Sequence, residues 1–395
     1  MEKPSLLIIT HMYATFIKDQ VDQMAPHFSH VYVLVRTNPF AEISRIIPVS
    51  YLVPFSVAQK IDLSNTPENV HVIQTPVFYL PTAKGYEKLG RNHLRSVERE
   101  LKKNRIEFDI IHAHFTWSAG YAGSKLKETY AVPFVITAHG MDIYELPFRN
   151  TFYTGQITRI LNSADHIITV SRNNLAAIDR LGVKKPVSVI LNGFNDRRFF
   201  ERDMQECRRT LGLPTDKKIL VNVAKLYDVV KGHEILIRAM QEVIKTREDV
   251  VCYIVGDGEL RTSLEKLITG LHLEQHVKIV GAKPHHEIPL WINAGDVFVL
   301  PSLNEGNPTV MFECLGCARP FIGTRVGGIP ETITSETYGI LSEPGNVQEL
   351  AKNILSSFSR EWDTEKISAY AKQFTWENIS KEILDVYTKV YKKKL

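Results

Sequence analysis

The chain has 395 residues with 44% hydrophobic and 23% charged side chains, shares that exclude a disordered or fibrous protein and favour two globular domains. A net charge of +4, without any zinc-finger, basic-zipper or RNA-recognition motif, argues against a nucleic-acid binder. Four cysteines are too few for a disulfide framework, and no apolar stretch is long enough to span a membrane, so we expect a cytoplasmic protein.

Short apolar runs separated by amphipathic, helix-length stretches recur along the first half. The runs are continuous rather than alternating, which indicates parallel strands covered by helices on both faces. The predicted strands of this half are residues 5–10, 31–35, 70–74, 110–114, 134–138, 167–170 and 187–191.

The second half repeats the pattern after a turn at Asn192-Gly193 and a charged stretch. Its predicted strands are residues 219–223, 250–255, 277–280, 297–300 and 321–323. We therefore predict two doubly wound α/β domains, residues 1–192 and 193–375, and a surface helix that ends in Lys392–Lys394. In such sheets ligands bind beyond the carboxyl ends of the strands, so residues that follow strands are the first candidates for a site.

Histidines end or follow two neighbouring strands of the first half. His112 and His114 end one strand, and His139 and Asp142 follow the next. The His-x-His spacing permits a metal site, but no third ligand stands at a recognisable spacing, so hydrogen-bonded structural histidines are favoured.

Lysines and glycines follow two strands of the second half. Lys225 and Lys231 stand just beyond the strand 219–223 and at the start of the next helix, where two cations can neutralise a diphosphate. Taken alone, they are better explained as two ordinary surface lysines. Gly256 and Gly258 follow the strand 250–255 in a partial Gly-rich loop, a weak signal by itself.

The densest motif is Pro301-Ser-Leu-Asn-Glu305-Gly306-Asn307-Pro308, followed by a helix that contains Glu313. A helix start offers free N–H groups to a phosphate, and carboxylates accept hydrogen bonds from sugar hydroxyls. The alternative is that Glu305 caps the helix and Glu313 is solvated. Cys314 and Cys317 have redox or zinc spacing, but without a second pair they read as small buried side chains.

In this order the motifs resemble those of glycosyltransferase family 4, and the resemblance runs over nearly the whole chain. Its quoted segments are Asp109–His114, Thr137–Asp142, Ile167–Ser171, Asn192–Phe199, Val223–Gly232, Val255–Glu259 and Glu305–Pro320. The resemblance implies retaining enzymes of the GT-B fold, in which two Rossmann-like domains face a central cleft. It also implies that the last helix, residues 376–395, crosses back onto the first domain.

The resemblance implies a role for each matched position. Lys225 and Lys231 hold the donor diphosphate, Glu305 holds hydroxyls of the transferred sugar, and Glu313 holds the ribose. His139 lies against the sugar near the reacting centre. Asp142 and Phe16 belong to the acceptor side. The remaining donor-binding positions are Gly306, Asn307, Pro308, Thr309, Gly256, Gly258, Gly281 and Lys283.

The sequence departs from the family at two places. Residues 11–17 stand where many members carry a double glycine near the donor phosphates, and Lys225 replaces the usual arginine, so the planar fork that grips phosphate is lost. The chain has no Asp-x-Asp motif, so we expect no metal or other cofactor, and the lysines and the helix start to hold the diphosphate.

The resemblance therefore predicts transfer of a hexose-type sugar from a UDP- or GDP-sugar, with retention, to a glycan or lipid-linked acceptor in polysaccharide or glycolipid synthesis. Since no carboxylate nucleophile is evident, the reaction rests on positioning and on charge stabilisation of the leaving diphosphate. Two alternatives remain open: a sugar-nucleotide epimerase of the same fold, and a non-catalytic glycan- or nucleotide-binding relative.

A basic stripe in the first half suggests a place for the acceptor. Its members recur at helical spacing and are Lys84, Lys88, Arg91, Arg95, Arg99 and Lys102. Upstream, residues 43–57 are apolar and broken by two prolines. A basic helix beside an apolar loop fits an anionic membrane surface, although a solvated helix and a packed loop explain the pattern as well.

Overall fold

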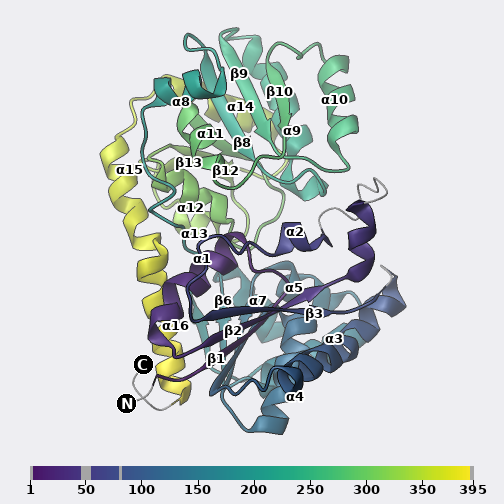
Figure 1. The fold of residues 1–395 in the computed structure, drawn as a ribbon. Helices are drawn as coiled ribbons and strands as arrows, with labels where there is room; N and C mark the ends of the chain where they lie inside the picture. The colour runs from purple at the N-terminus through teal and green to yellow at the C-terminus, as the bar shows by residue number, and fades with distance from the viewer. Residues whose placement is uncertain (1–2, 46–54, 80–81, 392–395) are drawn as a thin grey trace. The chain divides into compact units, whose positions relative to one another are not determined.

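The computed structural model describes residues 3–45, 55–79 and 82–391. The chain divides into two compact units, one formed by Met1–Asn192 with Trp376–Leu395 and the other by Gly193–Thr375. Each unit is a parallel sheet with helices packed on it (Figure 1). Every helix within the described residues is too short or too polar to cross a membrane.

The sheet of the N-terminal unit has seven parallel strands in the order β3-β2-β1-β4-β5-β6-β7. The chain starts in the centre, winds outward to β3 and returns to β4, so the order reverses between β1 and β4. The strands are β1 (Leu6–Thr10), β2 (Val31–Thr37), β3 (Val70–Pro76), β4 (Ile110–His114), β5 (Phe134–Ala138), β6 (His166–Thr169) and β7 (Val187–Val189).

Helices cover both faces of this sheet, because successive residues of its strands alternate between two apolar cores. Leu7 and Ile9 of β1 face one core, and Leu6 and Ile8 face the other. The first core includes residues of α3 (Ala83–Lys103), α4 (Tyr121–Tyr130), α6 (Thr151–Ser163) and α7 (Asn173–Arg180). The second includes α1 (Thr15–Met24) and α16 (Trp376–Tyr391), which lie side by side in Figure 1. Two short helices, α2 (Val57–Lys60) and α5 (Met141–Tyr144), lie in loops.

The sheet of the C-terminal unit has six parallel strands in the order β10-β9-β8-β11-β12-β13. They are β8 (Lys218–Val223), β9 (Val250–Val255), β10 (Val277–Gly281), β11 (Val297–Leu300), β12 (Phe321–Thr324) and β13 (Gly339–Ser342). Its helices are α8 (Met204–Leu211), α9 (His233–Ile244), α10 (Arg261–Gly270), α11 (Ile288–Ala294), α12 (Thr309–Gly316), α13 (Ile329–Thr332), α14 (Val347–Phe358) and α15 (Thr364–Ala371).

The prediction of two doubly wound α/β sheets is confirmed, and all twelve predicted strands are present. β13 was missed, because Gly339-Ile-Leu-Ser342 offers only two apolar residues. The last helix begins at Trp376, and one of its faces is buried against β1 and α1. Lys392–Lys394, predicted to end it, lie outside the described residues.

Candidate functional site

Glu305 lies in the loop between β11 and α12, with only 7% of its surface exposed. One carboxylate oxygen, Oε1, accepts hydrogen bonds from Lys231 Nζ at 2.7 Å and from Ser302 Oγ at 2.7 Å. Oε2 makes no hydrogen bond within the described residues. α12 begins at Thr309 after Pro308, and no side chain caps it. Glu305 is therefore not a helix cap, and one of its oxygens is left to accept from a ligand.

Glu313 lies in the second turn of α12 and is 9% exposed, so it is not the solvated carboxylate of the alternative interpretation. Its Oε1 lies 3.2 Å from Nε2 of His285, whose Nδ1 accepts from Nη1 of Arg198 at 2.7 Å. The ring of Phe199 packs on His285 at 5.4 Å. Sequence reasoning missed His285, although it follows Lys283-Pro284 beyond the end of β10.

The two lysines approach each other on the loops after β8. Lys231 ends a short turn before Gly232, whose φ of +71° is a left-handed conformation that favours glycine. A Cβ at Gly232 would lie 2.0 Å from the Pro301 carbonyl oxygen, so the lysine turn packs directly on the loop that carries Glu305. The pKa of Lys225 is lowered by desolvation and then by the charge of Lys231, although the residue as a whole stays exposed. Two cations therefore stand close together.

The predicted glycines hold neighbouring loops in close contact. A Cβ at Gly256 would lie 1.9 Å from the Ala224 carbonyl oxygen, and one at Gly258 would lie 2.4 Å from Leu226. The Gly256 amide donates to the Gly281 carbonyl at 3.0 Å. These glycines therefore bring the backbone that follows β9 against the Lys225 loop.

The other predicted donor residues differ in their surroundings. The Lys283 ammonium lies 5.8 Å from the centre of the Trp291 ring. The Gly306 carbonyl accepts from Gly328 at 2.7 Å, which fixes the loop before α12. Asn307 and Pro308 are buried, and α12 begins at Thr309. A helix start leaves amide donors without helical partners, and those of α12 follow directly after Glu305 in the chain.

In the N-terminal unit, His139 follows β5 and is half-buried among aromatic rings. Its Nε2 lies 3.0 Å from Nδ1 of His114, and its Nδ1 is buried without a hydrogen-bond partner. The rings of Phe16 and Phe115 lie 5.3 and 4.6 Å away. Burial, and then His114, holds the pKa of His139 well below its usual value, so the imidazole is neutral at pH 7.

Asp142 organises the loop that carries His139. One of its oxygens accepts from the amides of His139 and Gly140 at 2.9 Å, and the other accepts from the amide of Thr116 at 2.8 Å. Desolvation raises the pKa of this carboxyl in spite of the three amides. The carboxylate is engaged by backbone, so its local effect is to position His139, and its place on the acceptor side stays a prediction.

The His-x-His pair and the cysteines have structural surroundings. His112 lies 2.7 Å from Thr137 Oγ1, bonds the Tyr387 hydroxyl and stacks on His114. In the part of the chain that the structure describes, no three His, Cys, Asp or Glu side chains come together as metal ligands. The four cysteines are buried and unbonded to one another, as small core side chains are.

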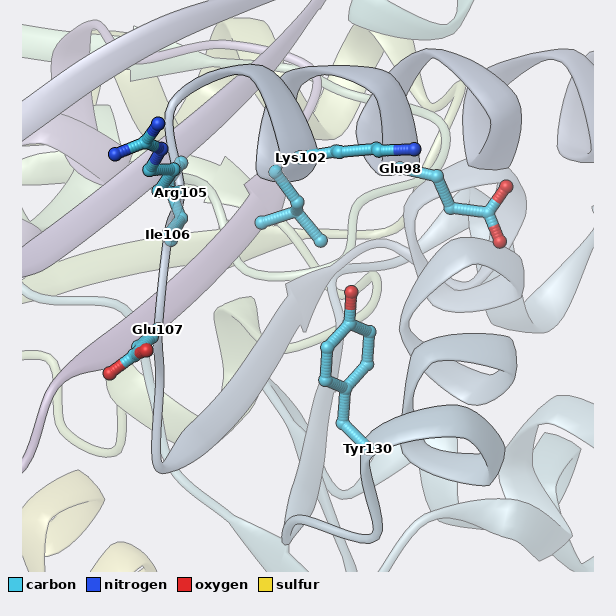
Figure 2. Close-up of a pocket in the computed structure, with 7 residues that line it drawn as sticks. Glu98, Lys102, Arg105, Ile106, Glu107 and Tyr130 are labelled. Atoms are coloured by element: carbon cyan, nitrogen blue, oxygen red, sulfur yellow. The ribbon is translucent and has the colours of Figure 1, made fainter.

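The basic stripe lies on α3, and all six of its members are exposed. Residues 46–54 of the apolar stretch predicted beside it lie outside the described residues. A surface hollow of about 460 Å³ lies where α3 ends. Figure 2 shows the Tyr130 hydroxyl pointing toward the turn of α3 that carries Lys102. The hollow is lined by two acidic and two basic side chains, and apart from Lys102 it contains none of the predicted site residues.

Each half of the chain matches a known protein family model. Residues 203–374 match the family model of glycosyl transferases group 1, and residues 30–198 match that of glycosyltransferase family 4. TuaC of Bacillus subtilis (strain 168), a glycosyltransferase named for teichuronic acid biosynthesis, is 30% identical over 280 residues, which cover 68% of this chain and 67% of TuaC.

Solved structures share the fold. Sucrose-phosphate synthase from Thermosynechococcus elongatus superposes with a TM-score of 0.79 at 21% identity, covering 98% of this chain and 99% of that one. HepE from Anabaena, solved with UDP-glucose, superposes with a TM-score of 0.73 at 22% identity, covering 98% and 100%. With two matching family models and a relative at 30% identity, the chain belongs to the group 1, family 4 glycosyltransferases of the GT-B fold.

Proposed function

We propose that this glycosyltransferase moves a hexose-type sugar from a UDP- or GDP-sugar to a glycan or lipid-linked acceptor, with retention at the anomeric carbon. The observation that carries the proposal is the contact between Lys231 and the buried Glu305, directly before the start of α12. A cation, helix amides and a carboxylate with one open oxygen are together the groups that a diphosphate and its sugar need.

Within the C-terminal unit the roles divide by charge. Lys231 and Lys225 neutralise the diphosphate as its bond to the sugar breaks, with help from the amides at the start of α12. Glu305 Oε2 accepts from a hydroxyl of the sugar, and Glu313 accepts from the ribose. The UDP-glucose complex of HepE supports a uridine nucleotide as the first donor to test.

The reaction proceeds by attack of the acceptor on the face that the diphosphate leaves. His139 is neutral at pH 7, so it acts by accepting or donating a hydrogen bond rather than as an imidazolium acid. We propose that no metal is needed, because two lysines supply the positive charge that a metal ion otherwise supplies. Turnover that is unchanged in excess EDTA supports this, and loss restored by Mg²⁺ or Mn²⁺ overturns it.

The acceptor belongs to polysaccharide or glycolipid synthesis in this proposal. The name of TuaC, which denotes teichuronic acid biosynthesis, supports a polymer. The exposed stripe on α3 supports a peripheral position at an anionic membrane, where a lipid-linked acceptor is held.

The proposal is tested first by thermal unfolding with UDP, GDP, ADP and their sugars. A ligand present at about 100 times its Kd stabilises the folded state by about 2.7 kcal/mol, which raises the melting temperature measurably. We expect a shift with UDP or GDP that is lost in Glu313→Gln. The control Glu274→Gln changes an exposed carboxylate and keeps the shift.

The chemistry is then followed by proton NMR of the sugar. Retention gives a product with the anomeric configuration of the donor. An isomer of the nucleotide sugar formed without any acceptor identifies an epimerase instead. Binding of a nucleotide without turnover of any UDP- or GDP-sugar leaves a non-catalytic relative.

A further inference from the structure

Four basic side chains gather at the carboxyl edge of the N-terminal sheet. Arg36 lies near the end of β2, Lys60 ends α2, His11 follows β1, and His93 lies on α3. Arg36 and Lys60 are each only 7% exposed. Sequence reasoning included His11 only as part of the segment 11–17 and did not name the other three, because Arg36 directly follows the apolar run 31–35 and Lys60 stands in a short helix.

The cluster is held together by hydrogen bonds. Arg36 Nη1 donates to Ser118 Oγ at 2.8 Å and to His11 Nε2 at 3.3 Å. Lys60 Nζ donates to the Arg36 carbonyl at 3.1 Å. Ser118 Oγ also lies 2.9 Å from Nδ1 of His93, whose Nε2 lies 3.2 Å from Thr75 Oγ1. Every partner is neutral, so the two cations are positioned but not neutralised.

A negative partner is missing from this cluster. Within the described residues no Asp or Glu forms an ion pair with Arg36 or Lys60, and the undescribed segments 46–54 and 80–81 contain no Asp or Glu in their sequence. The Arg36 Nε is buried and has no hydrogen-bond partner. Buried charges are costly unless they are paired, so the arrangement is incomplete as it stands.

Other buried cations of the chain are compensated. Lys18 pairs with Asp22 at 2.5 Å, and Arg208 pairs with Asp296 at 2.7 Å. Arg319 donates to the Arg202 carbonyl and has the charge of Glu201 nearby. Around Lys60, by contrast, burial and then the charge of Arg36 lower its pKa to about 7. The same two causes hold the pKa values of His11 and His93 well below their usual range.

The position of the cluster is that of a ligand site. Two of its members lie at the carboxyl ends of β1 and β2, and its hydrogen-bond partners Thr75 and Ser118 lie near the end of β3 and in the loop after β4. The strand order reverses between β1 and β4. In doubly wound sheets ligands bind at that point. The cluster also continues toward His139, since His11 stacks on Phe115 at 4.7 Å and Phe115 contacts the His139 ring at 4.6 Å.

We propose that Arg36 and Lys60 bind a phosphoryl group of the acceptor. The assignment to an acceptor rests on the proposed glycosyl transfer, whereas the binding of the anion does not. Arginine offers a planar set of donors that matches phosphate oxygens, and lysine adds a second charge, so two cations suit a phosphate dianion. His11 and His93 are neutral and serve as hydrogen-bonding groups that orient Arg36 and Ser118.

The test adds inorganic phosphate to the full chain in a buffer that otherwise contains no phosphate. Calorimetry and thermal unfolding measure its binding. We expect phosphate to raise the melting temperature, and Lys60→Met and Arg36→Met to weaken its binding at least about tenfold, which corresponds to about 1.4 kcal/mol. Lys184→Met removes an exposed cation of the same unit and keeps the binding. An unchanged wild-type melting temperature, or binding that survives in both cluster variants, overturns the proposal.

A purely structural role gives a different result. Because Lys60 is an uncompensated charge, Lys60→Met should melt at or above the wild-type temperature without phosphate. A fall of several degrees makes Lys60 a structural residue and overturns the proposal, and this readout remains if Arg36→Met does not fold.

The variant Lys231→Met distinguishes the proposed donor site from the proposed phosphate site. This variant should keep phosphate binding and lose the shift with UDP, whereas Lys60→Met should lose the former and keep the latter. Failure of UDP to bind any form of the protein counts against the proposed function alone.

The source of the phosphoryl group is found by competition. Glucose 1-phosphate that displaces inorganic phosphate points to a soluble acceptor, and short-chain phosphatidic acid that displaces it points to a lipid acceptor. Either result supports the phosphoryl assignment. If succinate binds and phosphate does not, the phosphoryl assignment is overturned, and the cluster is a carboxylate site.

Discussion

At the scale of single residues, the ion pair between Lys231 and Glu305 joins a side chain that is 33% exposed to one that is 8% exposed. Glu305 is the more buried partner of the pair. The hydrogen bonds that its carboxylate accepts and its negative charge therefore determine how it binds a ligand. Glutamine keeps the size of Glu305 and an oxygen that accepts from Ser302, but it removes the charge.

We predict that Glu305→Gln lowers turnover of the donor sugar at least about 100-fold, because loss of one orienting contact displaces the sugar from its reactive position. Steady-state kinetics with the donor found by thermal unfolding measures the effect. Glu274→Gln, an exposed carboxylate of the same unit, is the matched control. Unchanged turnover in both Glu305→Gln and Lys231→Met contradicts the assignment of the site.

The glycine at position 232 is a second feature at the scale of single residues, and Gly212 offers a matched control for it. Gly212 has a φ of +66° with open space around it, whereas Gly232 has a φ of +71° and faces the Pro301 carbonyl. Alanine at position 212 therefore has only the cost of a left-handed backbone conformation. Alanine at position 232 has that cost and, in addition, a steric clash with the Pro301 carbonyl.

We predict that Gly212→Ala lowers the free energy of unfolding by about 1–2 kcal/mol. Gly232→Ala should lower it by about 1–3 kcal/mol more, because the neighbouring loop must move. The same variant should weaken UDP binding, since Lys231 stands on that turn. Urea unfolding measures the change in stability, and calorimetry measures UDP binding. An equal loss of unfolding free energy in the two variants shows that the contact with Pro301 does not limit the residue at position 232.

Several of the candidate residues that sequence reasoning identified follow a strand in a segment marked by Gly or Pro. Glu305, Lys231 and His139 fit this description, and their roles stay predictions. The bond between His285 and Glu313 joins residues 28 apart in sequence, so it forms only when the loop after β10 folds against α12. Arg36 was missed because a strand of mostly buried apolar residues gives no sign that one charged member meets a serine from another loop.

At the scale of elements, strands were predicted more reliably than their surroundings. A parallel strand buried on both faces needs a run of apolar residues, and twelve such runs are visible in the sequence. β13 pairs with β12 through Gly339–Ser342, and its place in the sheet depends on that neighbour rather than on its own composition. α16 illustrates a similar limit, since its helical spacing is local but its packing against α1 joins distant parts of the chain.

The exposed stripe on α3 is the element-scale feature with a functional consequence. Each lysine or arginine close to an anionic membrane contributes about 1 kcal/mol of attraction. We predict that Arg91→Glu/Arg95→Glu abolishes flotation of the protein with vesicles that contain anionic lipid, while thermal stability stays within about 1 kcal/mol of wild type.

Arg209→Glu/Lys266→Glu is the control, because it replaces two exposed cations of the other unit and changes the net charge equally, from +4 to 4 − 4 = 0. An equal loss of flotation in both variants shows that net charge acts rather than the stripe. Recovery of wild-type protein that is the same with neutral and anionic vesicles removes the membrane from the proposed function.

At the scale of the whole molecule, histidines with depressed pKa values are distributed unequally between the two units. Seven of them lie in the N-terminal unit, and desolvation is the first cause in each: His11, His71, His93, His112, His114, His139 and His166. Burial lowers the pKa of His114 to about 3. In the C-terminal unit, burial and then Lys231 lower the pKa of His233 to about 4. Acid should therefore act mainly on the N-terminal unit.

The direction follows from proton uptake. Well above pH 6.5 these histidines are neutral in the folded and the unfolded chain, so they do not affect stability. Below it the unfolded chain binds protons that the folded unit does not, and each such histidine lowers the free energy of unfolding by about 1.4 kcal/mol per pH unit. Asp22 and Asp142, whose pKa values are raised by desolvation, act in the opposite sense and reduce the net slope.

We predict that between pH 6.5 and 5 the N-terminal unit loses protection first, while the C-terminal unit keeps it. Hydrogen exchange of peptides from β1, β4 and β5 against peptides from β8, β9 and β11, corrected for the intrinsic rate at each pH, measures the difference. His139→Asn should reduce the slope of the N-terminal unit by about 1.4 kcal/mol per pH unit, and His272→Asn, at an exposed position, should leave it unchanged. Because seven of these eight histidines lie in one unit, equal loss of protection in both units contradicts the view that desolvated neutral histidines set the acid limit of this protein.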